Sequence, residues 1–412
     1  MNTWTTLRSF PLPIRLLVVN QFGVNVGFYL LLPYLAGYLA DDVGLSAAVI
    51  GIVLGVRNLS QQGLFLLGGS AADRLGARGV IIAGCALRAV GFGLFALGTA
   101  LPVLLAASVL SGLAGALFNP AVRSYLAQAA ADRRAEAFAL FTVFASAGAL
   151  LGPLLGSALL LVDFRAAALT AAALFAALTV AQAVWLPAPP ATTRGATVWQ
   201  DWRTGLTDRR FLAFSIALAG MFALQTQLYL ILPVQAEHLT GHPAAVAVLF
   251  VASTTVTLTL QLPLNRRLRR RNRGASITAG MAVMGAGFLL PLLRVPSLSP
   301  VLRLVPVLAA AVLLTLGVMI AQPFVLELIP AFAGPHLTGT YFGLFYLVSG
   351  VLAAGCTAAV GATVGTATGT GVPPAAWLLT AAVGAASAGA VWLLRLDGRR
   401  TATSTPTPAG VS

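Results

Sequence analysis

The sequence contains few charged residues and no lysine. Only 9% of its 412 residues are Asp, Glu, Lys or Arg, whereas about a quarter of the residues in a soluble domain are charged. Hydrophobic residues make up 58% of the chain. So few charges do not cover that much apolar surface in water, and disordered chains are polar and charged. The composition excludes both classes and indicates a helical protein with many membrane spans.

Cysteine and histidine are also scarce. Cys85 and Cys356 both lie in apolar runs, which favours two small buried side chains over a disulfide or a metal pair. Of the three histidines, only His238 and His242 have an i, i+4 spacing. The lack of lysine removes the Gly-Lys-Ser/Thr phosphate loop, and no nucleophile–base set is visible. We therefore expect no enzyme activity, no metal, no cofactor and no ATP drive within this chain.

Twelve apolar runs are long enough to cross a bilayer, whose hydrocarbon core of about 30 Å requires about 20 apolar residues in a helix. The runs cover approximately residues 14–39, 47–71, 79–100, 103–128, 137–162, 165–186, 211–235, 243–264, 274–293, 301–329, 338–363 and 374–395. The fold class expected from these runs is an all-α membrane protein with twelve transmembrane helices.

The longest polar stretch divides the twelve spans into six and six. We expect an N-terminal half (1–186), a cytoplasmic central loop (187–210), a C-terminal half (211–396) and a disordered cytoplasmic tail (397–412). A net charge of +14 is compatible with nucleic-acid binding in principle, but the arginines sit in short segments between spans, where they act as topology signals. We expect no nucleic-acid partner.

Arginine placement predicts the orientation. With the N-terminus in the cytoplasm, only Arg165, Arg294 and Arg303 lie between spans on the outer side. All other arginines outside the spans then lie on the cytoplasmic side, as the positive-inside rule requires. Both termini are therefore expected in the cytoplasm.

The two halves repeat each other weakly. One constant shift along the chain places Asn119-Pro120 on Gln322-Pro323 and Gly152 on Gly355. Two six-helix halves related by a parallel repeat are typical of a large transporter class, whose substrate site lies between the halves.

A charged motif connects spans two and three. It reads Gly69-x-Ala71-x-Asp73-Arg74-x-Gly76-x-Arg78 and closely resembles the signature loop of the major facilitator superfamily. The glycines permit close helix approach and a tight turn, and the charges can pair with each other or with helix ends. We interpret the motif as a latch that holds the cytoplasmic side shut in one state. The alternative is an ordinary positive-inside loop. The equivalent loop at 265–273 has arginine but no acid.

Span five carries a second motif, Gly148-x-x-x-Gly152-Pro153-x-x-Gly156-Ser157. It resembles the antiporter motif of drug–proton exchangers in the same superfamily, with Ser157 in place of the usual last glycine. Small residues at every fourth position allow tight helix contact, and Pro153 removes a backbone donor and kinks the helix. The alternative is a generic small-residue packing face.

The segment GVRNLSQQG at 55–63 resembles a bacterial branch of multidrug exporters. Two positions depart from that branch. The first span has polar but uncharged residues where a carboxylate is often found, and Ser108 stands near the place of an arginine in span four. Both departures count against proton coupling through those positions.

Three ionisable residues lie well inside apolar runs, where a charge costs about 2.5–3.5 kcal/mol on insertion scales. Glu327 is the single embedded carboxylate and the best candidate for a proton carrier, with a structural ion pair as the alternative. Arg57 and Arg88 leave the pathway net positive, which favours anionic or zwitterionic substrates. The alternative is that both arginines only anchor hydrogen bonds. Arg123 is near a span end, where snorkelling explains it.

Several other polar residues lie on one helix face at a spacing of i, i+4. Asn119 and Gln322 each precede a proline, in two spans that the repeat relates. The predicted substrate and proton pathway consists of Asn20, Gln21, Asn25, Arg57, Gln61, Arg88, Asn119, Gln225, Gln322 and Glu327.

Taken with these residues, the resemblance implies a major-facilitator fold in the bacterial plasma membrane. The expected function is export of a small amphiphilic drug or natural product by alternating access in exchange for protons. Its partners would be the lipid bilayer, the small-molecule substrate and protons, with a monomer as the expected state. An importer or uniporter of an organic anion on the same fold stays open, as does a non-transporting membrane sensor.

Overall fold

The computed structural model describes residues 3–188, 197–242, 244–268, 271–293, 300–334, 336–365 and 371–394. Within these ranges the chain forms helices and no strand. The tail expected at 397–412 lies outside the described residues.

The helices alternate with short turns along the whole described chain. In order they are α1 (Thr3–Arg8), α2 (Leu12–Asp41), α3 (Ala47–Gly63), α4 (Phe65–Leu75), α5 (Ala77–Leu97), α6 (Leu101–Ala129), η1 (Ala131–Arg133), α7 (Arg134–Leu160), α8 (Phe164–Trp185), α9 (Val198–Thr207), α10 (Arg209–Thr226), α11 (Ile231–Thr240), α12 (Ala244–Leu268), α13 (Arg273–Gly287), η2 (Leu290–Leu292), α14 (Pro300–Arg303), α15 (Val305–Ala333), α16 (Thr338–Gly365) and α17 (Pro374–Leu393).

The described helices account for the expected membrane spans. Eleven helical segments are long and apolar enough to cross a bilayer, and the pair α3 and α4, bent by 45°, makes up to twelve. The break in this pair falls at Leu64, directly after Gly63. Another span is the joined segment Arg209–Thr240, in which a short turn separates α10 from α11. The all-α fold with twelve spans is therefore confirmed.

Polar side chains at span boundaries begin several helices. Asp208 accepts hydrogen bonds from the backbone N–H groups of Arg210 and Phe211, at 3.1 and 3.0 Å, and so caps α10. At α9, Thr197 and Gln200 form a reciprocal capping box. Such caps satisfy backbone donors that have no partner within the helix. The central polar stretch thus contains a defined helix, and the next span starts immediately after it.

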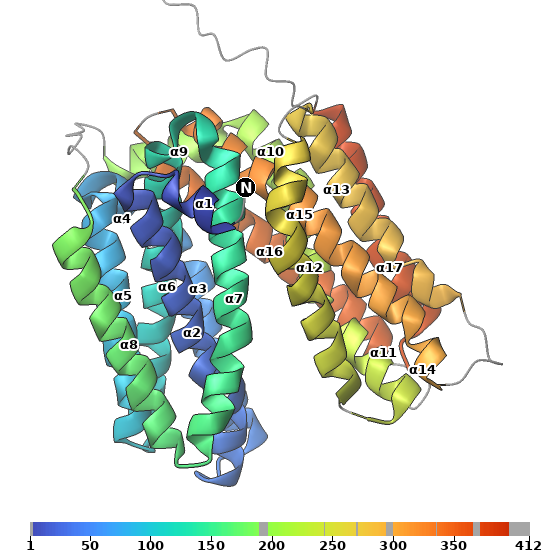
Figure 1. Ribbon diagram of the computed structural model, residues 1–412, viewed down its shortest axis with the longest axis horizontal. Helices are drawn as coiled ribbons and strands as arrows, with labels where there is room; N and C mark the ends of the chain where they lie inside the picture. The colour runs from blue at the N-terminus through green and yellow to red at the C-terminus, as the bar shows by residue number, and fades with distance from the viewer. Residues whose placement is uncertain are drawn as a thin grey trace, which may run out of the picture.

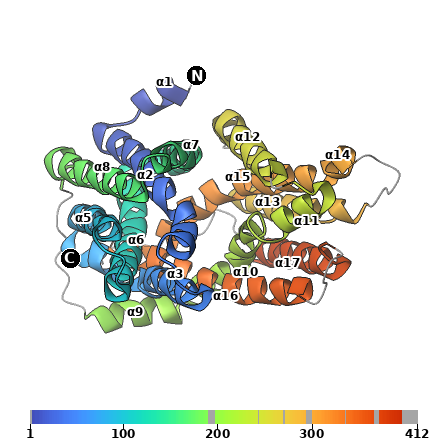
Figure 2. The same ribbon diagram turned by 90° about the horizontal axis from the view of Figure 1, so that it is seen from below.

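The helices form two groups that lie side by side (Figures 1 and 2). One group contains α2–α8 and the other contains α10–α17. In Figure 1 the groups converge at the end that carries α1 and α9 and diverge toward the end that carries α11 and α14. We call the first end the α9 face and the second the opposite face.

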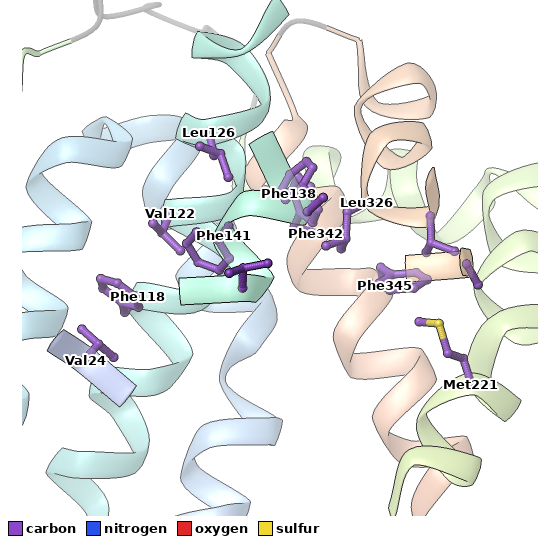
Figure 3. Packing of buried hydrophobic residues seen from close by; sticks show 14 of the residues in the cluster. Val24, Phe118, Val122, Leu126, Phe138, Phe141, Met221, Leu326, Phe342 and Phe345 are labelled. Atoms are coloured by element: carbon purple, nitrogen blue, oxygen red, sulfur yellow. The ribbon is translucent and has the colours of Figure 1, made fainter. Parts of the chain in front are cut away.

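Buried aromatic residues join the two groups near the α9 face. Phe138 of α7 and Phe342 of α16 lie with ring centroids 6.2 Å apart, and both side chains are fully buried. Figure 3 shows this pair between Phe141 of the first group and Leu326 and Phe345 of the second. The apolar core therefore continues across the boundary between the groups at this level.

Candidate functional site

A cavity of about 240 Å³ lies between the two groups of helices. One wall comes from α7, and the others come from α12, α15 and the end of α10. It is lined by Thr142, Ser146, Ala149, Gln225, Leu228, Tyr229, Phe250, Ser253, Thr254, Thr257, Gln261, Leu314, Thr315, Val318, Met319 and Gln322. None of these described lining residues carries a charge, so the cavity combines an apolar surface with neutral hydrogen-bonding groups.

Two of the predicted pathway residues line this cavity, namely Gln225 and Gln322. The prediction missed a polar row on α12 formed by Ser253, Thr257 and Gln261, all buried. Their spacing of i, i+4 and i+8 puts them on one helix face. The same test that selected Gln225 would have found this row in the sequence.

The polar residues of α2 connect that helix to α7 instead. Gln21 donates a hydrogen bond from Nε2 to Asn25 Oδ1 at 2.9 Å. Asn25 in turn donates from Nδ2 to the carbonyl oxygen of Ala145 at 2.8 Å. This places both side chains at a contact within the N-terminal group, close to the cavity wall on α7.

Arg57 has neutral partners inside the N-terminal group. Its guanidinium donates to Asn58 Oδ1 and Gln61 Oε1, both at 2.8 Å, and lies 4.7 Å from the ring centroid of Phe28. Only 7% of the residue is exposed. The predicted pair of Arg57 and Gln61 is therefore in direct contact, but neither residue is in the lining of the described cavity.

Arg88 lies deeper in the same group and is 5% exposed. Its guanidinium carbon is 4.9 Å from the ring centroid of Phe118 and 5.8 Å from that of Phe175. The nitrogen Nη1 is buried without a hydrogen-bond partner among the described residues, as are both side-chain polar atoms of Asn20. The aromatic faces supply cation–π contact in place of a carboxylate.

Asn119 contacts Arg123 on the same helix, α6. Arg123 donates to the carbonyl oxygen and to Oδ1 of Asn119, at 2.9 and 3.2 Å. Its guanidinium also lies 4.9 Å from the ring centroid of Tyr346 on α16. Arg123 thus belongs to the contact between the two groups of helices.

Glu327 lies near the α9 face in a second cavity, of about 340 Å³. Its carboxylate forms an ion pair of 2.8 Å with Arg273, the first residue of α13. The N-terminal group contributes another pair to the same cavity, Arg133 with Glu136 at 3.0 Å. Glu136 is buried, with 6% of the residue exposed. The cavity therefore collects charges of both signs from both groups.

The charged motif between α4 and α5 holds α4 against α16. Asp73 accepts hydrogen bonds from the backbone N–H groups of Gly339 and Thr340, at 2.7 and 2.6 Å. These groups belong to the first turn of α16, which is the positive end of the helix dipole. A Cβ atom on Gly69 would overlap the carbonyl oxygen of Gly339, so the two backbones meet as closely as glycine permits. Gly76, with φ of +86°, makes the turn into α5.

The two arginines of the motif have different partners. Arg74 forms an ion pair with Asp201 of α9, at 2.5 Å. Arg78 donates to the carbonyl oxygens of Ala183 and Leu186 at the end of α8, at 2.5 and 2.6 Å.

The indole N–H of Trp202 connects α9 to the contact between α4 and α16. It donates to Ser70 of α4 at 2.6 Å, while Gly205 of α9 packs against Leu344 of α16. The helix α9, which sequence reasoning treated as part of a loop, therefore touches both groups at the latch.

The second motif forms the face of α7 that packs on α2. A Cβ atom added to Gly148 or Gly156 would overlap a carbonyl oxygen of α2, and one added to Gly152 would lie 2.7 Å from Cβ of Tyr29. The carbonyl oxygen of Pro153 accepts a hydrogen bond from the hydroxyl of Tyr34 at 2.7 Å. The small residues therefore allow close contact between α2 and α7, the helix that forms one wall of the cavity.

The two groups of spanning helices with a cavity between them define a multi-pass membrane transporter. The sequence model of the Major Facilitator Superfamily matches residues 17–355. The chain belongs to this family, and the major-facilitator fold expected from its motifs is confirmed.

Relatives extend over most of the chain. An uncharacterized MFS-type transporter of Mycobacterium tuberculosis is 41% identical over 359 residues, covering 85% of each chain. The multidrug resistance protein MdtH of Klebsiella pneumoniae is 33% identical over 378 residues, covering 91% of this chain and 92% of its own. The crystal structure of the human organic anion transporter MFSD10 has a TM-score of 0.69 at 17% identity, covering 93% and 97% of the two chains; this similarity concerns the fold.

Proposed function

We propose that this transporter exports small amphiphilic organic molecules by alternating access, in exchange for protons. The observation that carries the proposal is the cavity between the two groups, whose lining mixes aliphatic, aromatic and neutral polar side chains. Sites for amphiphilic small molecules have this composition. The similarity to multidrug resistance proteins MdtH supports export as the direction.

We place the α9 face in the cytoplasm of a bacterial cell, with both termini on that side of the plasma membrane. The arginine distribution along the sequence supports this orientation. In this frame the described conformation is closed toward the cytoplasm by the Asp73 contact and by Phe138 with Phe342. The halves 1–186 and 211–396 would move as two bodies, and a single chain would suffice for transport.

We assign proton coupling to Glu327. Its ion pair with Arg273 lies in the charged cavity on the α9 face. Protonation would neutralise the carboxylate and break this pair, so the charge balance of the cavity would change as the proton binds. A proton taken up by Glu327 would thus favour a different packing of α13 and α15.

The test is accumulation of cationic, neutral and anionic fluorescent amphiphiles in cells that express the protein, with and without a protonophore. Lower accumulation that both the protonophore and Glu327→Gln abolish would support proton-driven export through Glu327. The matched control is Glu237→Gln, because Glu237 is an exposed carboxylate on α11. Lower accumulation that survives Glu327→Gln would contradict the assignment of coupling to this residue.

A second candidate function is uptake of an organic anion. It is favoured by Arg57, Arg88 and Arg123, which lie in the N-terminal group and make no ion pair among the described residues. This candidate predicts higher accumulation of the anionic amphiphile in expressing cells. A loss of that increase in Arg57→Gln would support it, and unchanged anion levels would rule it out.

A further inference from the structure

We propose that residues 3–10 form a strap that ties the two groups of helices together at the α9 face, across the seam where α7 packs against α12. The strap comprises α1 and the turn that follows it. It must release the second group before this side of the α9 face can open. The proposal goes beyond the proposed export function, because the strap would act in the same way for any substrate and for either direction of transport.

The strap is fixed to the first group through Arg133 of η1. Arg133 donates hydrogen bonds to the carbonyl oxygen and to the hydroxyl of Ser9, at 3.3 and 2.9 Å. Its guanidinium carbon also lies 4.0 Å from the ring centroid of Phe10. Leu7 and Phe10 are buried in the apolar core. Since Pro11 leads directly into α2, which belongs to the first group, this end of the strap stays with that group.

A residue of the second group holds the other part of the strap. Arg266, in the last turn of α12, donates a hydrogen bond from Nη2 to the hydroxyl of Thr6, which is 260 positions away in the chain. Thr6 is fully buried, so water competes little for this bond. Figure 2 shows α1 at the edge of the molecule, with its N-terminal end toward α7 and α12. The same short helix is therefore hydrogen-bonded to both groups.

The two attachments differ in how readily they separate. The first combines hydrogen bonds from a guanidinium, a cation–π contact and two buried apolar side chains. The second uses the long, flexible side chain of Arg266. A hydrogen bond weakens steeply when its distance and angle depart from the ideal. When the two groups move apart, the Arg266 bond should therefore break first, and the strap should stay on α7.

The strap lies at the seam that has no counterpart of the Asp73 carboxylate. On the other seam, Asp73 of α4 accepts hydrogen bonds from the first turn of α16. The repeat-related segment 265–273 contains arginines but no acidic residue. It contributes Arg266 as a donor instead, and the strap supplies Thr6 as the acceptor. Each seam thus has a polar contact between the two groups, and the N-terminal segment provides one partner of the second contact.

Thr6→Val tests the strap, because valine keeps the shape of threonine and removes the hydroxyl that accepts from Arg266. A hydrogen bond to a charged group contributes about a factor of ten or more to an equilibrium constant. We therefore expect the ratio of closed to open protein at this seam to fall about tenfold.

The distance across the seam measures this ratio. Spin labels at Gln128 and Ala275 report it by electron–electron double resonance on the purified full-length protein. Both residues are exposed near the α9 face, Gln128 at the end of α6 in the first group and Ala275 at the start of α13 in the second. Cys356→Ser leaves only the buried Cys85 as a native thiol. Thr6→Val should add a population at longer distance.

Three further variants separate the strap from ordinary packing of α1. Thr6→Ser keeps the hydroxyl and should keep the distance distribution of the unmodified chain. Arg266→Gln should act as Thr6→Val does, whereas Arg267→Gln, which changes the exposed neighbouring residue, should have no effect. The double variant of Thr6→Val and Arg266→Gln should add little to either single change, because both remove the same contact.

A distance distribution in folded Thr6→Val that matches the unmodified chain would overturn the proposal. Effects of Thr6→Val and Arg266→Gln that simply add in the double variant would also overturn it, since the two residues would then act independently. If Thr6→Val does not fold, the comparison of Arg266→Gln with Arg267→Gln decides, and equal distributions in these two variants would reject the strap. The measurement needs no substrate, so its outcome is independent of whether the chain exports the fluorescent amphiphiles.

Discussion

Replacing Asp73 by asparagine should open the α9 face. The carboxylate accepts two backbone hydrogen bonds from the first turn of α16, at 2.7 and 2.6 Å from Gly339 and Thr340. An asparagine side chain keeps one acceptor oxygen, loses the negative charge, and turns an N–H₂ group toward the second backbone donor. The variant therefore loses most of the interaction while changing almost no volume.

The size of the effect follows from the geometry. A hydrogen bond to a charged group contributes about 1.5–3 kcal/mol, against about 0.5–1.5 kcal/mol for a neutral one. Losing one charged bond and weakening the other therefore costs the closed state about 2–3 kcal/mol. Since 1.4 kcal/mol is a factor of about ten in an equilibrium constant, the ratio of closed to open protein should fall about 30- to 140-fold.

Electron–electron double resonance between spin labels at Leu75 and Ala331 would measure this shift. Both residues are exposed near the α9 face, on opposite sides of the contact between the groups. Cys85 is fully buried, and Cys356→Ser removes the other thiol. Asp73→Asn should add a longer-distance population that the unmodified chain lacks.

The control is Asp42→Asn, which removes an exposed aspartate at the end of α2, away from the latch. It should leave the distance distribution unchanged. If Asp73→Asn also left the distribution unchanged in properly folded protein, the Asp73 contact would not be what holds the α9 face closed.

Three further predictions concern the other contacts. Gly156→Leu should lower the melting temperature of the purified protein by several degrees, because the added side chain would overlap the backbone of α2. Gly355→Leu should change the melting temperature little, because a Cβ atom added there meets no atom within 4 Å. Asp201→Asn should weaken the latch less than Asp73→Asn, since the amide oxygen can still accept a hydrogen bond from Arg74, whose side chain is 27% exposed to screening by water; the same distance measurement tests this. Glu327→Gln should make initial export rates insensitive to an imposed pH gradient, and rates that still follow the gradient would contradict the coupling assignment.

The membrane spans were predictable because each one requires a long apolar run, which is a feature of that segment alone. Runs of about 20 apolar residues must be helical in lipid, since backbone polar groups have no other partner there. The charged motif was also visible in the sequence, because Gly69 and Asp73 stand at fixed positions in a known pattern; its role as a latch stays a prediction. The partner of the motif was not visible, since the N-terminus of α16 is more than 260 residues away in the chain. That contact exists only in the folded chain, where the two groups of helices pack together.

The predicted pathway was less accessible to sequence reasoning. A spacing of i, i+4 defines a helix face but not the neighbour that this face meets. Gln225 and Gln322 face the cavity between the groups, whereas Gln21 satisfies its hydrogen bonds through Asn25 inside one group. The row that includes Gln261 has the same spacing, so the same test would have selected it.

The weak internal repeat explains why the α9 face closes differently on its two sides. On one side, α4 and α16 meet through glycine backbones and the Asp73 cap. The repeat-related segment 265–273 contains no acidic residue. It therefore has no carboxylate that could cap the start of α7 as Asp73 caps α16. That side instead contains a polar cavity, in which Glu136 and Glu327 each pair with an arginine.

Under the proposed exchange mechanism, this asymmetry would give the two contacts different tasks. The α4–α16 contact is close-packed, because glycine backbones meet there and Asp73 caps α16. The α7–α13 side instead holds the two carboxylate–arginine pairs that line the second cavity. If Glu327 carries the proton as proposed, protonation would act on this charged side, whereas the Asp73 contact would oppose opening. Substitutions at Glu327 should accordingly change the pH dependence of the distance between the labels at Leu75 and Ala331. Substitutions at Asp73 should shift that distance at neutral pH.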